Sequence, residues 1–318
     1  MAHAGTTVGL HVHPGRHHTF TLRGPPTLER AREGFQTRLT RNVNRSVPLA
    51  TPPASLFSLV KYPTALGDMS AYLTPKPKEG GRHPAIIWLI GGFPPGGAGK
   101  ITWGRPLPGN DQSASQYRLA GIVMLYPTLR GDFDNPGNQE SFLGEVDDVL
   151  AALEYLRTVD YVDPSRIYLG GHSTGGTLAL LVSEVTNEFR AVFSFGPVDR
   201  PTQYDGRHLT YDWTDAQENR VRSPIHFLHG VTSPTFIIAG QKGNSASLRA
   251  MSRANDNPAL QFIEILGGNH FNYLAPLNNL LAERVISYDG SGPFRLSEHE
   301  CQGAFNAREQ SQSSRNHQ

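Results

Sequence analysis

The stretch that decides the fold is residues 166–181, RIYLGGHSTGGTLALL, in which a pair of glycines stands on each side of one serine. An apolar run precedes the first pair and a second apolar run follows the other, as expected for a strand that turns directly into a buried helix. Residues 171–175 match the pattern G-x-S-x-G, in which the serine sits on a strained strand-to-helix turn and projects beyond the sheet. The pattern predicts that Ser173 is a nucleophile.

Further apolar runs lie on both sides of this stretch. Near-continuous runs suit strands that are covered on both faces, as in a parallel sheet. They are AIIWLIGG (85–92), GIVMLYP (121–127), RIYLGG (166–171), AVFSFGPV (191–198), TFIIAG (235–240) and QFIEIL (261–266). Two shorter runs, FSLVKYP (57–63) and MSAYLTP (69–75), come before them and end in prolines.

Helical patterns separate the strand-like runs. Residues 144–159 place their apolar side chains on one face, and residues 177–185 are apolar all round. Residues 244–254 and 276–286 are amphipathic, the first with Asn244 or Ser245 as the expected N-cap. Strand and helix alternate from residue 85 to residue 287, which predicts the α/β class, with a mostly parallel central sheet and helices on both faces.

The composition bounds the organisation of the chain. We expect residues 1–55 to form an N-terminal extension with a hairpin at Pro14–Gly15, residues 56–287 to form the α/β domain, and residues 288–318 to be a disordered tail. Residues 200–221 form a polar insertion that carries aromatic side chains, and we expect a small lid there. Tyr204, Tyr211 and Trp213 of this insertion are candidates to line a pocket.

Charge and cysteine content exclude several classes of protein. The 318 residues carry 29 Lys and Arg against 28 Asp and Glu, so no charge excess points to nucleic acid or to a membrane surface. No apolar run approaches the length of a membrane span, and the N-terminus has no signal-like apolar region. The single cysteine, Cys301, excludes an intramolecular disulfide and favours a reducing compartment. We therefore expect a cytoplasmic protein.

Four stretches, one of which contains residues 166–181, define a resemblance to a known family. VDPSRIYLGGHSTGGTLALL (162–181), YPTLRGDFDNPG (126–137) with GEVDDVLAALEYL (144–156), and RSPIHFLHGVTSPTFIIAG (222–240) resemble the catalytic domain of the prolyl oligopeptidase family. The likeness covers about residues 57–287 and implies an α/β-hydrolase fold with a serine nucleophile. The family's β-propeller is not expected, because few residues precede the first strand of the sheet.

A serine nucleophile needs a base, and in α/β-hydrolases the histidine follows the last strand. FIEILGGNHFNYLAP (262–276) supplies an apolar strand, two glycines and then His270, which we predict to be the base. His172 is expected to pack rather than to act, since consecutive residues at a sharp turn point apart. The clustered histidines at 11, 13, 17 and 18 lack a matching acid or cysteine pattern, and we predict no metal and no organic cofactor.

Backbone amides are expected to form the oxyanion hole. In the family a His-Gly-Gly-like loop follows the first parallel strand, and here Ile90 replaces that histidine before Gly91 and Gly92. We predict that Thr174 donates one N–H and that Gly92 or Phe93 donates the other.

The sequence leaves open which residue completes a catalytic triad, that is, which acid orients the histidine. The family places an aspartate three or four residues beyond the glycine of TFIIAG, where this chain has Gly243 and Asn244. Asn244 can fix the tautomer of His270 but cannot stabilise an imidazolium by charge. Asp199 follows the preceding strand, as the acid does in some lipases, although the family also carries an aspartate there without a triad role. We favour Asp199 and keep Asn244 as the alternative.

Together these residues predict a serine hydrolase that cleaves an ester, amide or peptide bond through an acyl-enzyme. A small-molecule carboxylesterase or dienelactone-hydrolase-like enzyme is an alternative. A non-catalytic binding protein on the same fold is another, favoured by the missing acid. The expected partner is a small ester, amide or short peptide, with no nucleic acid and no membrane.

Overall fold

A computed structural model describes residues 25–94, 98–104 and 109–315. These residues form one eight-stranded sheet of order β1-β2-β4-β3-β5-β6-β7-β8. β1 and β2 run antiparallel to their neighbours, and all later pairs are parallel. The strands are β1 (Ser58–Thr64), β2 (Gly67–Leu73), β3 (His83–Leu89), β4 (Val123–Pro127), β5 (Val162–His172), β6 (Val192–Phe195), β7 (Thr235–Gly240) and β8 (Leu260–Ile265).

Both faces of the sheet are buried, which explains why its strands read as continuous apolar runs. In β3, Ile87 and Leu89 point into one hydrophobic cluster, and Ile86 and Trp88 point into a second cluster. Alternate side chains of a strand lie on opposite faces, so one apolar run supplies both clusters. The predicted mostly parallel sheet is confirmed.

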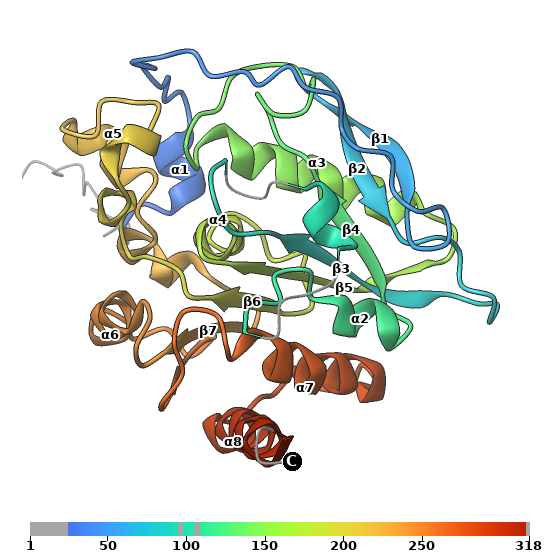
Figure 1. Cartoon of the computed structure of the whole chain (residues 1–318). Helices are drawn as coiled ribbons and strands as arrows, with labels where there is room; N and C mark the ends of the chain where they lie inside the picture. The colour runs from blue at the N-terminus through green and yellow to red at the C-terminus, as the bar shows by residue number, and fades with distance from the viewer. Residues whose placement is uncertain (1–24, 95–97, 105–108, 316–318) are drawn as a thin grey trace, which may run out of the picture.

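Helices cover the two faces in separate groups (Figure 1). α3 (Gly144–Thr158) and α4 (Thr174–Ser183) lie on one face, with α6 (Ser245–Arg253) toward its edge. α2 (Ser115–Leu119), α7 (Leu274–Ser287) and α8 (Glu298–Arg315) lie on the other. The remaining short helices are α1 (Leu28–Arg32), α5 (Ala216–Arg220), η1 (Lys100–Thr102), η2 (Pro201–Gln203), η3 (Gly206–His208), η4 (Pro224–His226) and η5 (Leu228–Gly230).

The strand order predicts a ligand-binding crevice at the carboxyl ends of β3 and β5, and we refer to this place as the crevice. β3 pairs with β4 on one side and with β5 on the other, so the direction of winding reverses between β3 and β5. In open α/β sheets, ligands bind outside the carboxyl ends of the strands at such a switch point. The segment 91–93 follows β3 and Ser173 follows β5, and both therefore lie at this crevice.

The N-terminal segment packs onto the domain where the structure describes it. Leu28 is fully buried, and isolated bridges join Leu39 to Tyr211 and Arg45 to Asp132. The predicted hairpin at Pro14–Gly15 lies outside the described residues. Among the described helices, none has the length and apolar content needed to span a bilayer.

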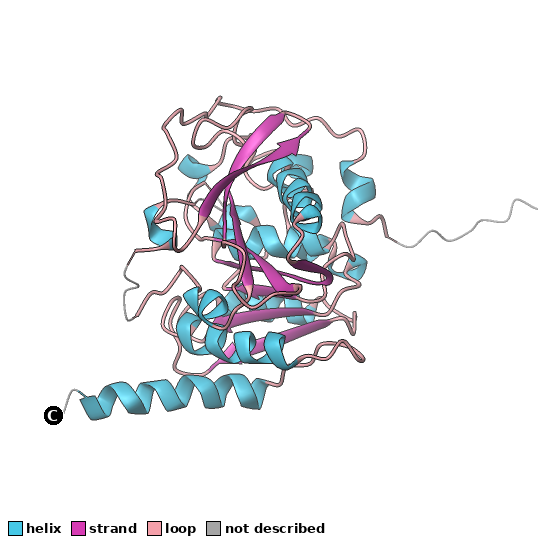
Figure 2. Ribbon diagram, turned by 90° about the vertical axis from the view of Figure 1, so that its right-hand side faces the viewer, coloured by secondary structure: helices cyan, strands magenta, loops and turns pink. Residues whose placement is uncertain are grey.

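The prediction of a disordered tail is wrong for residues 298–315. Residues 298–315 form α8, which lies against α7 and β8 at the base of the molecule (Figure 2). Cys301 and Phe305 are one helical turn apart and are buried against the sheet side, and Phe294 and Leu296 precede them in the same cluster. The segment is mostly polar in composition, so its composition does not reveal these few apolar residues. Cys301 is therefore a core residue.

Replacement of Phe305 by alanine tests the docking of α8. The side chain is 4% exposed, so its loss leaves a cavity and should lower the free energy of unfolding by about 3–5 kcal/mol. Chemical denaturation measures this change. His299→Ala on the exposed side of the same helix is the control and should change stability by less than about 0.5 kcal/mol. Equal stability of both variants would contradict the docked position.

Candidate active site

The backbone at Ser173 has the geometry of a nucleophile turn. Its φ of 56° and ψ of −116° are unfavourable for a residue with a side chain, and α4 begins at the next residue. Its N–H donates to the carbonyl of Phe195 at 2.8 Å, which ties the turn to the end of β6. Ser173 is half-buried, whereas the residues on both sides of it are buried. The turn thus presents the serine at the crevice.

The glycines around the serine are required by close approach of neighbouring backbone. A Cβ on Gly171 would lie 2.4 Å from the carbonyl oxygen of Gly175. A Cβ on Gly175 would lie 2.1 Å from the Leu89 carbonyl oxygen, and one on Gly176 would lie 2.5 Å from that of Phe195. Side chains at these positions would push α4 away from β3 and β6, and the turn would open.

His270 lies in the loop between β8 and α7, as the sequence predicts. The loop is closed by Asn269, whose side-chain oxygen accepts the N–H groups of Phe271 and Asn272 at 2.8 and 3.0 Å. The His270 ring contacts that of His172, with 4.6 Å between centroids. A Cβ on Gly196, which has φ 55° and directly follows Phe195, would lie 3.1 Å from His270 Cε1. The structure therefore brings His270 beside the serine turn.

The hydrogen bonding of the His270 imidazole is incomplete within the described residues. Its Nδ1 is buried and has no hydrogen-bond partner among the described residues, and the same holds for the phenol oxygen of Tyr273. Both atoms lie beside Gly196, at 3.3 and 3.0 Å from where its Cβ would stand. Burial lowers the pKa of His270 below its ordinary value. Within the described residues Ser173 Oγ makes no hydrogen bond to His270, a contact that often tightens only when substrate binds.

Asp199 is not placed to orient the base. Its buried carboxylate accepts a hydrogen bond from Ser247 at 2.8 Å and pairs with Arg200 at 2.6 Å. These contacts turn it toward α6, and no bond to His270 is present among the described residues. The structure does not support the sequence-based preference for Asp199.

The alternative, Asn244, reaches the base only through a neighbour. It stands at the N-cap position of α6 but makes no capping bond with its side chain. Its Nδ2 donates instead to the carbonyl of Gly196 at 2.7 Å, the residue against which His270 packs. A Cβ on Gly243 would lie 3.1 Å from the His270 Cα, so the position where the family has an acid adjoins the base. Glycine there leaves the imidazole without a carboxylate.

The predicted oxyanion segments meet at the crevice. The Thr174 hydroxyl donates to the carbonyl of Gly92, which joins the start of α4 to the loop after β3. Thr174 is the first residue of α4, so its N–H has no partner within the helix. The N–H of Gly91 is already used, because it donates to the Gln112 side chain at 3.1 Å. Gly92 and Phe93 therefore remain the candidates for the second donor.

An aromatic cluster adjoins this loop. Phe93 stacks on His208 with 4.9 Å between centroids and meets Tyr204 edge-on at 5.2 Å. Tyr204 also stacks on Phe142, and its hydroxyl lies 2.9 Å from that of Thr177 on α4. The insertion 200–221 therefore packs against the oxyanion loop through Tyr204 and His208.

The other aromatic candidates of the insertion lie elsewhere. Tyr211 is buried under the guanidinium of Arg222, and Trp213 is half-exposed outside the cluster. Sequence reasoning missed Phe142, because it stands in a polar loop without a periodic pattern.

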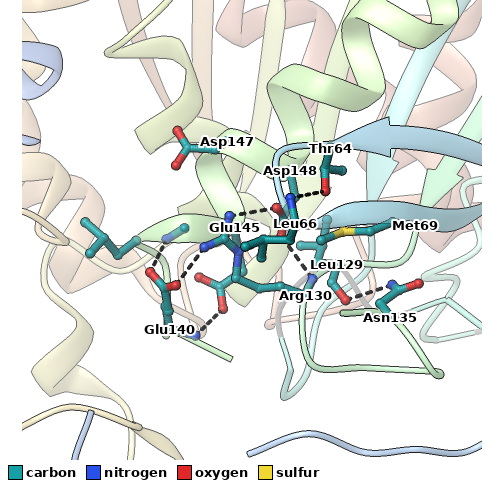
Figure 3. A network of polar contacts seen from close by, with 12 residues as sticks. Thr64, Leu66, Met69, Leu129, Arg130, Asn135, Glu140, Glu145, Asp147 and Asp148 are labelled. Carbon is teal, nitrogen blue, oxygen red and sulfur yellow. Dashed lines mark hydrogen bonds and ion pairs between the residues drawn. The ribbon is translucent and has the colours of Figure 1, made fainter. Parts of the chain in front are cut away.

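A buried charge network holds the loop that carries Phe142 (Figure 3). Arg130 binds Asp148 through two side-chain nitrogens at 2.8 and 3.0 Å and reaches Glu140 at 2.7 Å. Glu145 accepts the N–H groups of Glu140 and Ser141 at 2.7 and 3.1 Å. Burial raises the pKa of Glu145 to about 7, and Arg130 opposes that rise. Since Phe142 has φ 78°, these contacts support a strained backbone next to the crevice.

No group of three or more metal-binding side chains occurs in the described part of the chain. The histidines at 11, 13, 17 and 18 lie outside it.

The eight-stranded, mostly parallel sheet with helices on both faces is an α/β-hydrolase fold. Residues 111–250 match the sequence model of the prolyl oligopeptidase family. An uncharacterized peptidase of Bacillus subtilis, YtmA, is 27% identical over 190 residues, which cover 56% of this chain and 70% of that protein. Residues 111–250 of this chain are thus similar to the prolyl oligopeptidase family, whose members are serine hydrolases.

Solved structures show the same fold at lower identity. A puromycin-hydrolyzing peptidase of Mycobacterium tuberculosis is 16% identical, with a TM-score of 0.59 over 77% of this chain and 42% of that one. Est1E from Butyrivibrio proteoclasticus is 19% identical, with a TM-score of 0.51 over 72% of this chain and 97% of that one. The chain thus covers less than half of the peptidase's length but nearly all of Est1E's.

The lowered pKa of His270 predicts the pH dependence of catalysis. A base must be neutral to accept a proton, and a lowered pKa keeps it neutral at more acidic pH. As pH rises, kcat/KM should therefore increase through a midpoint below 6.5, the ordinary value for histidine. Hydrolysis rates of an activated ester across the pH range measure this midpoint. A midpoint above that value, typical of an imidazole paired with a carboxylate, would contradict the geometry.

Replacement of Asp199 by asparagine tests the absence of a triad acid. A triad aspartate changed to asparagine costs about 10⁴ in kcat. Because Asp199 binds Ser247 and Arg200 rather than His270, we expect kcat to fall less than about tenfold, within the range of a small structural change. Ser247→Ala removes a partner of the same carboxylate and should have a similarly small effect. A loss of several orders of magnitude in Asp199→Asn alone would restore the triad role.

Proposed function

We propose that this chain hydrolyses an ester, amide or peptide bond through an acyl-enzyme formed on Ser173. The observation that carries the proposal is the strained backbone of Ser173 at a strand-to-helix turn, at a topological switch point, with His270 packed beside the turn. A strained serine held by close glycine contacts is costly to keep without a use for it. The nucleophile, the base and the oxyanion donors then each have a candidate at the carboxyl ends of β3 and β5.

The proposed reaction assigns one role to each group. Ser173 Oγ attacks the substrate carbonyl while its proton passes to Nε2 of His270. The negative charge on the carbonyl oxygen is stabilised by the N–H of Thr174 and that of Gly92 or Phe93, each worth about 3 kcal/mol. Collapse of the tetrahedral intermediate breaks the ester or amide bond, and His270 returns the proton to the leaving group. Water, deprotonated by His270, then releases the acid and regenerates Ser173.

The aromatic cluster suggests the kind of substrate. Phe93 belongs both to this cluster and to the oxyanion loop, so an acyl group bound at Ser173 would lie near the rings of Tyr204 and Phe142. Such rings favour apolar or aromatic groups over charged ones. We propose that residues 200–221 form one wall of the substrate site through Tyr204.

A non-catalytic binding protein is the second candidate, and one observation favours it. No carboxylate binds His270 in the described residues, so the imidazolium formed during acylation lacks its usual stabilising charge. The two candidates differ in whether Ser173 turns over substrate.

Replacement of Ser173 by alanine separates them. We expect wild-type protein to hydrolyse p-nitrophenyl esters or aminoacyl- and prolyl-anilides, and Ser173→Ala to lose nearly all turnover while it folds normally. Only the oxyanion hole and binding remain in such a variant, typically about 10³–10⁴-fold over water. Ser183→Ala, a buried serine at the far end of α4, is the matched control. Identical rates in wild type and Ser173→Ala would leave the binding protein as the better account.

A further inference from the structure

His172 stands between the two loops that carry the proposed base and the proposed oxyanion donors. It is the last residue of β5, directly precedes Ser173 and is fully buried. The loop after β8 lies against one edge of its ring, and the loop after β3 lies against the other. The sequence pattern suggested only packing for this residue.

The contact with the base loop fixes the position of a proton. His172 Nε2 lies 2.8 Å from the backbone carbonyl oxygen of His270. A carbonyl only accepts hydrogen bonds, so Nε2 carries the proton and donates it. Burial lowers the pKa of His172 to about 3, so its ring is neutral and has no second proton. The charge of the neighbouring His270 ring lowers this pKa further, whereas the hydrogen bond to the His270 backbone raises it.

The opposite edge of the ring packs against the loop after β3. Oε1 of Gln112 accepts the N–H of Gly91 at 3.1 Å and lies 3.2 Å from His172 Nδ1. Both Oε1 and the Nδ1 of a neutral Nε2–H ring are acceptors, so this is a packing contact, and the shorter contact to the His270 carbonyl is the hydrogen bond of the ring. The backbone carbonyl of Gln112 accepts the indole N–H of Trp88 at 2.9 Å, which fixes Gln112 to β3. A Cβ on Gly91 would lie 3.0 Å from His172 Nδ1, so the ring fills the space beside this loop.

We propose that His172 is a positioning residue for His270: the Nε2–H bond to the His270 carbonyl sets the distance of the base loop from the serine turn and from the oxyanion loop. This inference rests on the proposed function. The bond matters because no carboxylate of the described part of the chain holds the His270 ring from the far side. Its backbone contacts therefore decide where the imidazole stands, and a misplacement of about 1 Å can cost 10²-fold in rate.

Two amide substitutions provide a matched test, because they differ only in reach. The terminal nitrogen of glutamine occupies about the position of histidine Nε2, whereas that of asparagine corresponds to Nδ1. We expect His172→Asn to lower kcat by about 10²-fold with little change in KM, and His172→Gln to retain most of the wild-type kcat. Equal kcat values for the two folded variants, whether both high or both low, would overturn the positioning role.

A second measurement uses the wild-type protein and needs no activity. Nitrogen-15 NMR of the histidine rings should show His172 as the neutral Nε2–H tautomer from pH 7 down to about pH 5. An Nδ1–H tautomer, or a charged ring in that range, would overturn the bond to the His270 carbonyl. If wild-type protein hydrolyses nothing, the proposed function fails on its own, and the tautomer still decides whether His172 binds the base loop.

Discussion

The arrangement of the crevice depends on the strained turn at Ser173. Its backbone is kept in place by the hydrogen bond to Phe195 and by glycines that let α4 approach β3 and β6. The same approach brings the N-terminus of α4 against the loop after β3, where Thr174 binds Gly92. These contacts position both the nucleophile and the proposed oxyanion donors. The backbone geometry of the serine turn therefore determines where most of the proposed catalytic groups lie.

The strands and helices of the domain were predictable because both signals are local. A sheet covered on both faces needs continuous apolar runs, and α3 and α7 show regular apolar spacing. α8 was missed because its burial depends on four apolar side chains in a segment of mostly polar residues. For such a segment, average composition is a poor guide and the spacing of the apolar residues decides.

The site was predictable only where chain order determines position. Ser173 directly follows β5 and His270 lies in the loop after β8, and the structure places His270 beside the serine turn. Asp199 also follows a strand of the sheet, but the direction of its side chain is set by Ser247 and Arg200, which no sequence pattern relates to it. The contacts of His172 and Phe142 likewise arise from loops distant in sequence.

Among the described residues no carboxylate binds His270, and this shapes the proposed chemistry. With Gly243 beside the base, the imidazole is positioned by backbone and ring contacts, and its pKa is governed by burial rather than by a paired charge. Such a base remains neutral over a wide pH range but gains little stabilisation when it is protonated. We expect a slower acylation than in a complete triad, with the same covalent intermediate.

The central claim is that Ser173 forms a covalent acyl-type adduct with the help of His270. Intact-protein mass spectrometry after treatment with a fluorophosphonate, followed by peptide mapping, tests it most directly. The account predicts one adduct per chain, located on Ser173, and strongly slowed labelling in His270→Ala. A folded wild-type protein that forms no adduct on Ser173, or that labels equally fast without the histidine, would contradict it.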